Sequence, residues 1–321
     1  MSLRRFAVVT VFALLALGSN AAGAQTDPLL TAIGQFSSPT VQGRAAGFYG
    51  ALALVPNAAL TGGPSMGNKI QALRTLYPAD STQLTAGLTR LLAVENTDAT
   101  IGTLMSSPED ESSVDFYLDL VEAVADLNDP STMPALLGAI PSGGVVTNRL
   151  ASFGPLALDP VVNVLYDSDF QMRHAAAFTL VTMLQPPFNR SFTDGTSHSK
   201  LHAGLRVAIH RFGRSHAFAK APFEKVLNSM PAFAAGDLNE DGVVNCADLA
   251  IVAGALGKRA GQPGFDVRAD LEGEGHVDWD ELRKEGRYVA KTLGHSAHDR
   301  DHDDDFDLDD VLKSCHINIK R

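Results

Sequence analysis

The chain has 321 residues, of which 45% are hydrophobic and only 7% aromatic, and its formal net charge is −11. This length allows one to three domains with a large buried core, and the scarcity of aromatic residues favours packed helices over a β-sandwich. The acidic balance argues against nucleic acid or an anionic membrane as a partner, and it suits a protein that binds cations.

The first 24 residues have the three regions of a secretory signal peptide. Arg4 and Arg5 form a basic start, an apolar run extends from Phe6 to Gly18, and the small residues Ala22-Gly23-Ala24 end the segment. The apolar run is too short to span a bilayer, and a buried helix is the alternative. We expect cleavage near Ala24 and a mature protein that is secreted, periplasmic or held at the cell surface.

Residues 25–230 repeat an apolar pattern with helical spacing, and strand-like alternation is scarce. Breakers such as Pro56-Asn57 and Pro141-Ser142-Gly143-Gly144 separate the periodic segments. The pattern predicts an all-α domain built from short helix pairs. Four sets of residues each share one predicted helix face: Leu84, Leu88, Leu91 and Leu92; Tyr117, Leu120, Val121 and Val124; Leu158, Val161, Val162 and Leu165; Ala177, Leu180, Val181 and Leu184.

Two segments of this region resemble HEAT repeats. Leu127–Leu137 is similar to the turn and first helix of such a repeat. Phe153–Leu184 is similar to a nearly complete one, with Asp167-Ser168-Asp169 at the start of its second helix. The segment at Arg44 is similar to the segment at Arg173, and their separation would hold three repeats of about 43 residues. The resemblance implies an α-solenoid whose surface binds a protein partner, with an ordinary helical bundle as the alternative.

Two further patterns in this region point to catalysis only weakly. Gly63-Pro64-Ser65-Met66-Gly67 fits the spacing of a nucleophile elbow, but that elbow needs a preceding strand, so a Gly/Pro turn is predicted. His198 and His202 share a helical spacing, yet Ser199 stands where a zinc protease needs Glu. We predict an exposed loop over residues 189–199 and a solvated polar face for the two histidines. Met230-Pro231 then ends the helical domain.

Two twelve-residue windows of one design follow, at 237–248 (loop one) and 270–281 (loop two). Oxygen-bearing side chains stand at positions 1, 3, 5, 9 and 12, with Gly at position 6 and Val at position 8. Ca²⁺ takes roughly six to eight oxygen ligands, which a short loop provides when alternate residues point inward and position 7 contributes its carbonyl. The predicted ligands are Asp237, Asn239, Asp241, Val243, Asn245 and Asp248 in loop one, and Asp270, Glu272, Glu274, His276, Asp278 and Glu281 in loop two.

We therefore expect two Ca²⁺ ions, with a pair of acidic surface turns as the alternative. Glu281 suits position 12, which closes the cage, whereas Asp248 is one methylene shorter. Val244 and Val277, at position 8, are predicted to pair the two loops through a short β-bridge.

The duplicated loop-and-helix unit, residues 231–294, resembles a type I dockerin, a relative of the EF-hand that lacks the entering helix. Gly236–Asn245 and Phe265–Leu271 carry the resemblance. It implies a calcium-binding module in a secreted bacterial protein. Dockerins usually have Ser-Thr-like pairs at loop positions 10 and 11 to contact cohesin. Cys246-Ala247 and Trp279-Asp280 stand there, so the resemblance carries calcium binding over more directly than cohesin binding.

Residues 295–321 are rich in Asp and His. Asp299–Asp310 fits a degenerate third calcium loop with Asp304 at the turn position, followed by a short helix at Val311-Leu312; an acidic disordered tail is the alternative. The two cysteines, Cys246 and Cys315, either pair in an exported protein or remain buried thiols.

Together these features predict a secreted, non-enzymatic calcium-binding protein with a helical-repeat domain for protein–protein interaction. One alternative is a dockerin that assembles the helical domain onto a cohesin-bearing scaffold. The other is a helical hydrolase with an accessory calcium module, for which Ser65 is the nucleophile to test. The sequence shows no cofactor loop and no convincing catalytic residues.

Overall fold

The computed structural model describes residues 27–97, 111–213, 216–293 and 308–319. Within these ranges the chain is all-helical and contains no strand, which confirms the all-α part of the predicted fold class. None of these helices is both long and apolar enough to cross a membrane. The α-helices are α1 (Pro28–Gln35), α2 (Val41–Ala53), α3 (Met66–Leu76), α4 (Ser81–Thr97), α6 (Glu111–Asp126), α7 (Met133–Gly138), α8 (Gly144–Ser152), α9 (Pro155–Val164), α10 (Phe170–Met183), α11 (Gly195–Phe212), α12 (Ala217–Ser229), α13 (Cys246–Ala255), α14 (Trp279–Thr292) and α15 (Leu308–Ser314).

Short 3₁₀ helices at Asn57–Ala59, Pro78–Asp80, Pro130–Thr132, Ile140–Ser142 and Phe188–Ser191 fill several of the connections. Many helices begin at a polar side chain that accepts hydrogen bonds from the first exposed N–H groups, as Asp27 does for α1 and Asp194 for α11. Ser65 has this role in α3, where its hydroxyl accepts from the Asn68 N–H. The Gly-Pro-Ser-Met-Gly segment is therefore a helix-capping turn in the structure.

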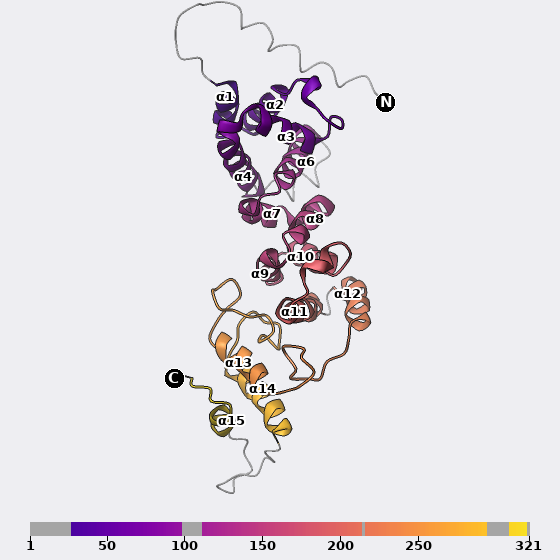
Figure 1. Ribbon diagram of the computed structural model, residues 1–321, viewed down its shortest axis with the longest axis vertical. Coiled ribbons are helices and arrows are strands. Elements are labelled where there is room, and N and C mark those ends of the chain that lie inside the picture. The colour runs from indigo at the N-terminus through magenta and orange to yellow at the C-terminus, as the bar shows by residue number, and fades with distance from the viewer. Residues whose placement is uncertain (1–26, 98–110, 214–215, 294–307, 320–321) are drawn as a thin grey trace, which may run out of the picture.

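The helices follow one another along the long axis of the molecule, from α1 at one end to α14 and α15 at the other (Figure 1). Most contacts join helices that are close in chain order: α1 with α2, α3 and α4 with α6, α8 and α9 with α10, α10 with α11, and α11 with α12. One cluster of buried apolar side chains runs through this whole array, from Leu29 in α1 to Phe223 in α12.

The helix faces predicted from periodicity lie in this core. The sets on α4, α6 and α9 are buried, as are Ala177 and Leu180 of α10, whereas Val181 and Leu184 are half-buried and pack against the cluster. Apolar residues with a spacing of three and four thus identified the buried faces correctly.

Arg44 in α2 and Arg173 in α10 occupy the same place relative to their helices. Each is the fourth residue of its helix. Each donates from Nη1 to the carbonyls five and six residues earlier, at Pro39 and Ser38 for Arg44 and at Ser168 and Asp167 for Arg173. The two helices, far apart in sequence, therefore fix their preceding turn by the same contact.

The prediction of an exposed loop over residues 189–199 is only partly right. Residues 189–196 are exposed apart from Phe192, but the helix that follows buries some of the polar residues. α11 begins at Gly195, and Ser197, Ser199 and His202 are buried rather than solvated. The polarity of these residues predicted a solvated face. In the structure, Glu240 of loop one contacts His202, and Arg268 donates to Ser199, on this side of α11.

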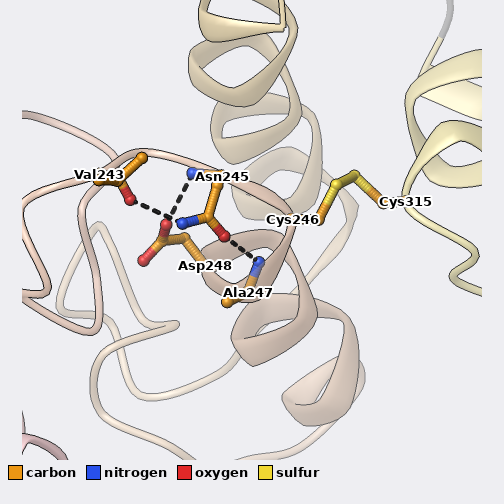
Figure 2. The surroundings of a disulfide bond; sticks show 6 residues. All are labelled: Val243, Asn245, Cys246, Ala247, Asp248 and Cys315. Atoms are coloured by element: carbon orange, nitrogen blue, oxygen red, sulfur yellow. Dashed lines mark hydrogen bonds between the residues drawn. A yellow bond between two sulfur atoms is a disulfide. The ribbon is translucent and has the colours of Figure 1, made fainter.

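A second apolar cluster holds α13, α14 and α15 together and includes Leu249, Leu282, Val311 and Leu312. Cys246, the first residue of α13, forms a disulfide with Cys315 just after α15, with a Cα–Cα distance of 5.3 Å (Figure 2). Phe265, in the segment between α13 and α14, packs against both clusters. The helical array and the C-terminal helices therefore meet around this segment.

Candidate metal centre

Loop one folds around the carboxylate of its first residue. Asp237 accepts from the Asp241 N–H at 3.1 Å and from the Gly242 N–H at 3.0 Å, so its side chain points into the loop. Gly242 has a φ of 90°, which makes the sharp turn at position 6 possible. Asn239 also accepts from the Asp241 N–H, at 3.0 Å. Burial raises the pKa of Asp237, and the charges of Asp248 and Asp241 raise it further.

Loop two repeats this arrangement position by position. Asp270 accepts from the Glu274 N–H at 3.1 Å and from the Gly275 N–H at 3.0 Å, and Gly275 has a φ of 92°. A third donor comes from the helical array, because the Tyr166 hydroxyl lies 2.6 Å from Asp270 Oδ2. The two sequence windows thus form loops of one geometry, each wrapped around a buried aspartate.

Position 9 of each loop begins the following helix. Asn245 caps α13 and Asp278 caps α14, and in both cases the position 12 side chain accepts from the N–H of the capping residue. The two loops differ in the hydrogen bonds of their position 12 side chains. Asp248 directs both oxygens to backbone N–H groups, at Leu238, Asn239 and Asn245; Figure 2 shows the bond to Asn245.

Glu281, at position 12 of loop two, keeps one oxygen available. Its Oε2 accepts from the Asp278 N–H at 2.8 Å, whereas its Oε1 is buried with no partner. Oxygens of Glu281, Glu272 and Glu274 lie within 4.8 Å of one another. Burial raises the pKa of Glu281 to about 7. A cation would neutralise this crowd of carboxylates and satisfy the buried oxygen, so loop two fits a Ca²⁺ ion.

The side chains at position 7, Val243 and His276, have different surroundings in the two loops. The Val243 side chain faces solvent, and its carbonyl accepts from the Asn245 side chain at 3.1 Å. The His276 ring lies between two acidic neighbours, 3.4 Å from Glu274 and 3.2 Å from Asp278. Neither side chain is needed as a ligand where the backbone carbonyl fills this position.

Glu285 is a site residue that the sequence reasoning missed. It lies on α14, is fully buried, and has no hydrogen-bond partner at either carboxylate oxygen. Burial raises its pKa to about 8, and the charges of nearby Asp248 and Asp237 of loop one contribute. The sequence did indicate that Glu285 is buried, because it stands three residues after Leu282 and four before Val289, on the apolar face of the helix. A buried carboxylate without a partner requires a proton or a cation beside it.

The predicted bridge between Val244 and Val277 is wrong. Val277 donates to the Lys258 carbonyl at 2.9 Å and accepts from the Gly257 N–H at 2.7 Å. An isolated antiparallel bridge joins Arg259 to His276 at this point. The chain turns back after α13, with Gly257 at a φ of 75°, and this segment takes the backbone groups that loop one was expected to bind.

Both loops are packed against the helical array. Arg268, just before loop two, donates to the buried Ser199 hydroxyl of α11 at 3.3 Å, and the Gly261 N–H donates to Asn163 of α9 at 2.9 Å. The Tyr166 ring packs edge-on against Phe265, with ring centroids 5.6 Å apart. The segments around the two loops and the end of the array therefore form one continuous structure.

A cavity of about 890 Å³ separates the two loops from α11 and α12. Asp237, Asp270, Glu272 and Glu285 contribute to its wall. Arg206, Arg268 and Lys284 also line it, so the cavity carries charges of both signs.

The proposed third loop, Asp299–Asp310, falls mostly outside the described residues. The helix expected after it is present as α15, with Val311 and Leu312 buried in the second cluster. In the comparisons with known proteins, no family model matches the chain, and no curated protein or solved structure matches it.

Proposed function

We propose that this chain is an exported, non-enzymatic calcium-binding protein. In this proposal a HEAT-like array presents a surface for a protein partner, and a dockerin-like pair of EF-hand loops holds two Ca²⁺ ions. The observation that carries it is the pair of loops with one backbone geometry, beside which buried carboxylate oxygens of Glu281 and Glu285 have no partner. Bound calcium would supply the positive charge that these carboxylates lack.

Two features support the HEAT-like interpretation of the array. The contacts of Arg44 and Arg173 with their preceding turns are the same, as expected of corresponding positions in repeats. Each helix packs mainly on neighbours in chain order, which is how a solenoid is built. Buried apolar side chains form one continuous core along the array. The helices are arranged in series along the long axis, so the array presents an extended surface (Figure 1).

The disulfide supports export. Disulfides persist in secreted and periplasmic proteins and are rare in the reducing cytosol. The pairing of Cys246 with Cys315 thus agrees with the signal peptide expected over residues 1–24.

The same disulfide bears on cohesin binding. Cys246 is position 10 of loop one, one of the positions through which dockerins contact cohesin, and here its sulfur is bonded to Cys315. The site on α13 therefore differs chemically from that of a cohesin-binding dockerin, and assembly through cohesin is our second proposal. A pull-down with a panel of cohesins separates the two, because specific retention would favour assembly.

The central test is calcium titration calorimetry on residues 25–321, combined with thermal unfolding with and without chelator. We expect two sites, or three if Asp299–Asp310 also binds, and a transition that chelator moves to lower temperature. Glu281→Gln should weaken one site about 100-fold, whereas Glu224→Gln, at an exposed position on α12, should weaken none. No binding at millimolar calcium, the weak end of the range for extracellular modules, would overturn the proposal.

A further inference from the structure

Three side chains with metal-ligating atoms meet where loop one packs against α11. His198 and His202 lie one turn apart on the helix, with ring centroids 4.7 Å apart. Glu240, at position 4 of loop one, places one oxygen near each ring. His198 Nδ1 lies 3.1 Å from Glu240 Oε2, and His202 Nδ1 contacts Oε1. The three ligand atoms fall within 4.8 Å of one another.

Burial and backbone conformation both hold this cluster in place. The side chains of His202 and Glu240 are 2% and 4% exposed, whereas that of His198 is 38% exposed. Glu240 has a φ of 59°, in the left-handed region that residues other than Gly rarely adopt. The loop thus maintains an uncommon conformation that directs this carboxylate towards α11.

The simplest alternative is a hydrogen-bonded trio in which each Nδ1–H donates to one Glu240 oxygen. That arrangement satisfies the carboxylate. Both this arrangement and a metal bound at Nδ1 leave His202 Nε2 buried without a partner, so that nitrogen does not separate the two interpretations. What favours a metal is that two imidazole nitrogens and a carboxylate oxygen lie within 4.8 Å of one another beside a partly exposed histidine.

We propose that His198, His202 and Glu240 form a binding site for a divalent transition metal of the Zn²⁺ class. Two imidazole nitrogens and one carboxylate oxygen are a common zinc ligand set, whereas Ca²⁺ and Mg²⁺ prefer oxygen alone. Ligand atoms around a tetrahedral Zn²⁺ lie about 3.3 Å apart, given bonds of about 2.0–2.1 Å. The 3.1 Å between His198 Nδ1 and Glu240 Oε2 is close to this spacing. The 2.5 Å between His202 Nδ1 and Glu240 Oε1 is shorter and would have to lengthen when a metal binds. The exposed edge of His198 leaves room for water as a fourth ligand.

This site is separate from the calcium ligands. Glu240 occupies position 4, whose side chain is not among the predicted calcium ligands, and both histidines belong to the array. A metal here would join loop one to α11 directly. Because buried His202 lacks an outer hydrogen-bond partner at Nε2, and such partners contribute roughly 10–100-fold to metal affinity, we expect moderate affinity, on the order of micromolar.

The test uses residues 25–321 stripped of metal and then saturated with Ca²⁺, so that the calcium loops are filled. Titration with Co²⁺ should give the visible absorption of a low-coordinate site at one ion per chain, and Zn²⁺ should displace it. His198→Ala and Glu240→Gln should each weaken binding at least about tenfold, since each removes one of three ligands. Both variants should still bind calcium, which separates failure of this site from failure of the loops.

His210→Ala is the matched control, because His210 is an exposed histidine on the same helix and belongs to neither the proposed cluster nor the calcium loops. This variant should keep full Co²⁺ and Zn²⁺ binding. The proposal is overturned if the wild-type chain binds neither ion below about 100 µM, or if binding survives unchanged in both His198→Ala and Glu240→Gln. The two test substitutions avoid His202, whose burial makes its loss a folding problem.

Discussion

Loop one and loop two share their spacing and their first turn, but their last carboxylates bind different groups. In loop one, Asp248 directs both oxygens to backbone N–H groups. In loop two, the longer Glu281 caps its helix with one oxygen and leaves the other buried without a partner. Glu281 is one methylene longer than Asp248. Both oxygens of Asp248 accept backbone hydrogen bonds, whereas one oxygen of Glu281 accepts none. Loop one instead has Glu285 nearby, a residue from the helix that follows loop two.

The loops also differ in how the rest of the chain holds them. Loop one is tied through Cys246 to Cys315, and its Glu240 contacts α11. Loop two has Trp279 at the matching position, and Tyr166 contacts its first aspartate. A repeated sequence motif has thus acquired two different supports, and each support can be removed separately.

Removing the disulfide should have the largest effect, and it should act on the helix of loop one first. For a sequence separation of 69 residues, loop-closure entropy predicts a loss of roughly 4 kcal/mol in the unfolding free energy of the C-terminal helices. We expect this in Cys246→Ser/Cys315→Ser, measured by urea unfolding in saturating calcium. Adding reductant to the wild type should reproduce the effect, and reductant should leave the double variant unchanged. Equal stability of variant and wild type would contradict the prediction.

Glu281→Gln and Asp248→Asn compare the two final carboxylates directly. Glu281→Gln should weaken calcium binding at loop two about 100-fold, or about 2.7 kcal/mol, because it removes charge from the oxygen that has no other partner. Asp248→Asn should mainly destabilise α13, by about 1 kcal/mol, through the loss of a capping carboxylate. Calorimetry gives the first effect and thermal unfolding in chelator the second. A larger loss of affinity in Asp248→Asn would show that Asp248 turns to the metal when calcium binds.

Glu285→Gln should have effects of opposite sign with and without calcium. With calcium, loop one should bind about tenfold more weakly, because a nearby negative charge is lost. Without calcium, the pKa of Glu285 is raised from 4.5 to about 8. A raised carboxylate pKa makes the folded chain bind more protons than the unfolded chain, so stability falls as pH rises from about 4.5 to about 8. Gln removes this loss.

In chelator at pH 8, Glu285→Gln should therefore unfold at a higher temperature than the wild type, whereas the two should be similar near pH 4.5. Asp280→Asn is the control, because Asp280 is exposed on the same helix. If Glu285→Gln is less stable than the wild type at pH 8 in chelator, Glu285 is a packing residue and not part of the calcium site.

The sequence pattern predicted the structure correctly where the structure depends on residues that are close together in the chain. The buried faces of α4, α6 and α9 followed from spacing alone, and Gly242 and Gly275 marked the turns because a positive φ is needed there. The contact of Arg44 with its own preceding turn, repeated at Arg173, also depends on a few adjacent residues.

The pattern failed where distant segments decide the outcome. The polarity of His198 and His202 predicted a solvated face, yet Glu240 of loop one, about 40 residues away in the chain, contacts both, and His202 is buried. Val277 was expected to pair with Val244, but its backbone groups are bonded to Gly257 and Lys258 in the segment after α13. The sequence placed Glu285 on the apolar face of α14, but it did not show that this residue would lie near Asp237 and Asp248 of loop one. Which of several polar residues becomes buried depends on tertiary packing that one sequence does not specify.

The smallest predicted effect concerns the support of loop two by the array. Tyr166→Phe removes the hydroxyl that donates to Asp270 at 2.6 Å, while the aspartate keeps its two backbone donors. We expect about 1 kcal/mol of lost stability and a roughly fivefold weaker calcium affinity at loop two alone. Tyr49→Phe is the matched control, because the Tyr49 hydroxyl donates to Asp119 at 3.0 Å within the array, far from either loop in sequence. If both variants bind calcium as the wild type does, the contact of the array with loop two does not affect the calcium affinity of that loop. If Tyr166→Phe weakens both sites equally, the loops respond as one unit and their separate supports do not act separately.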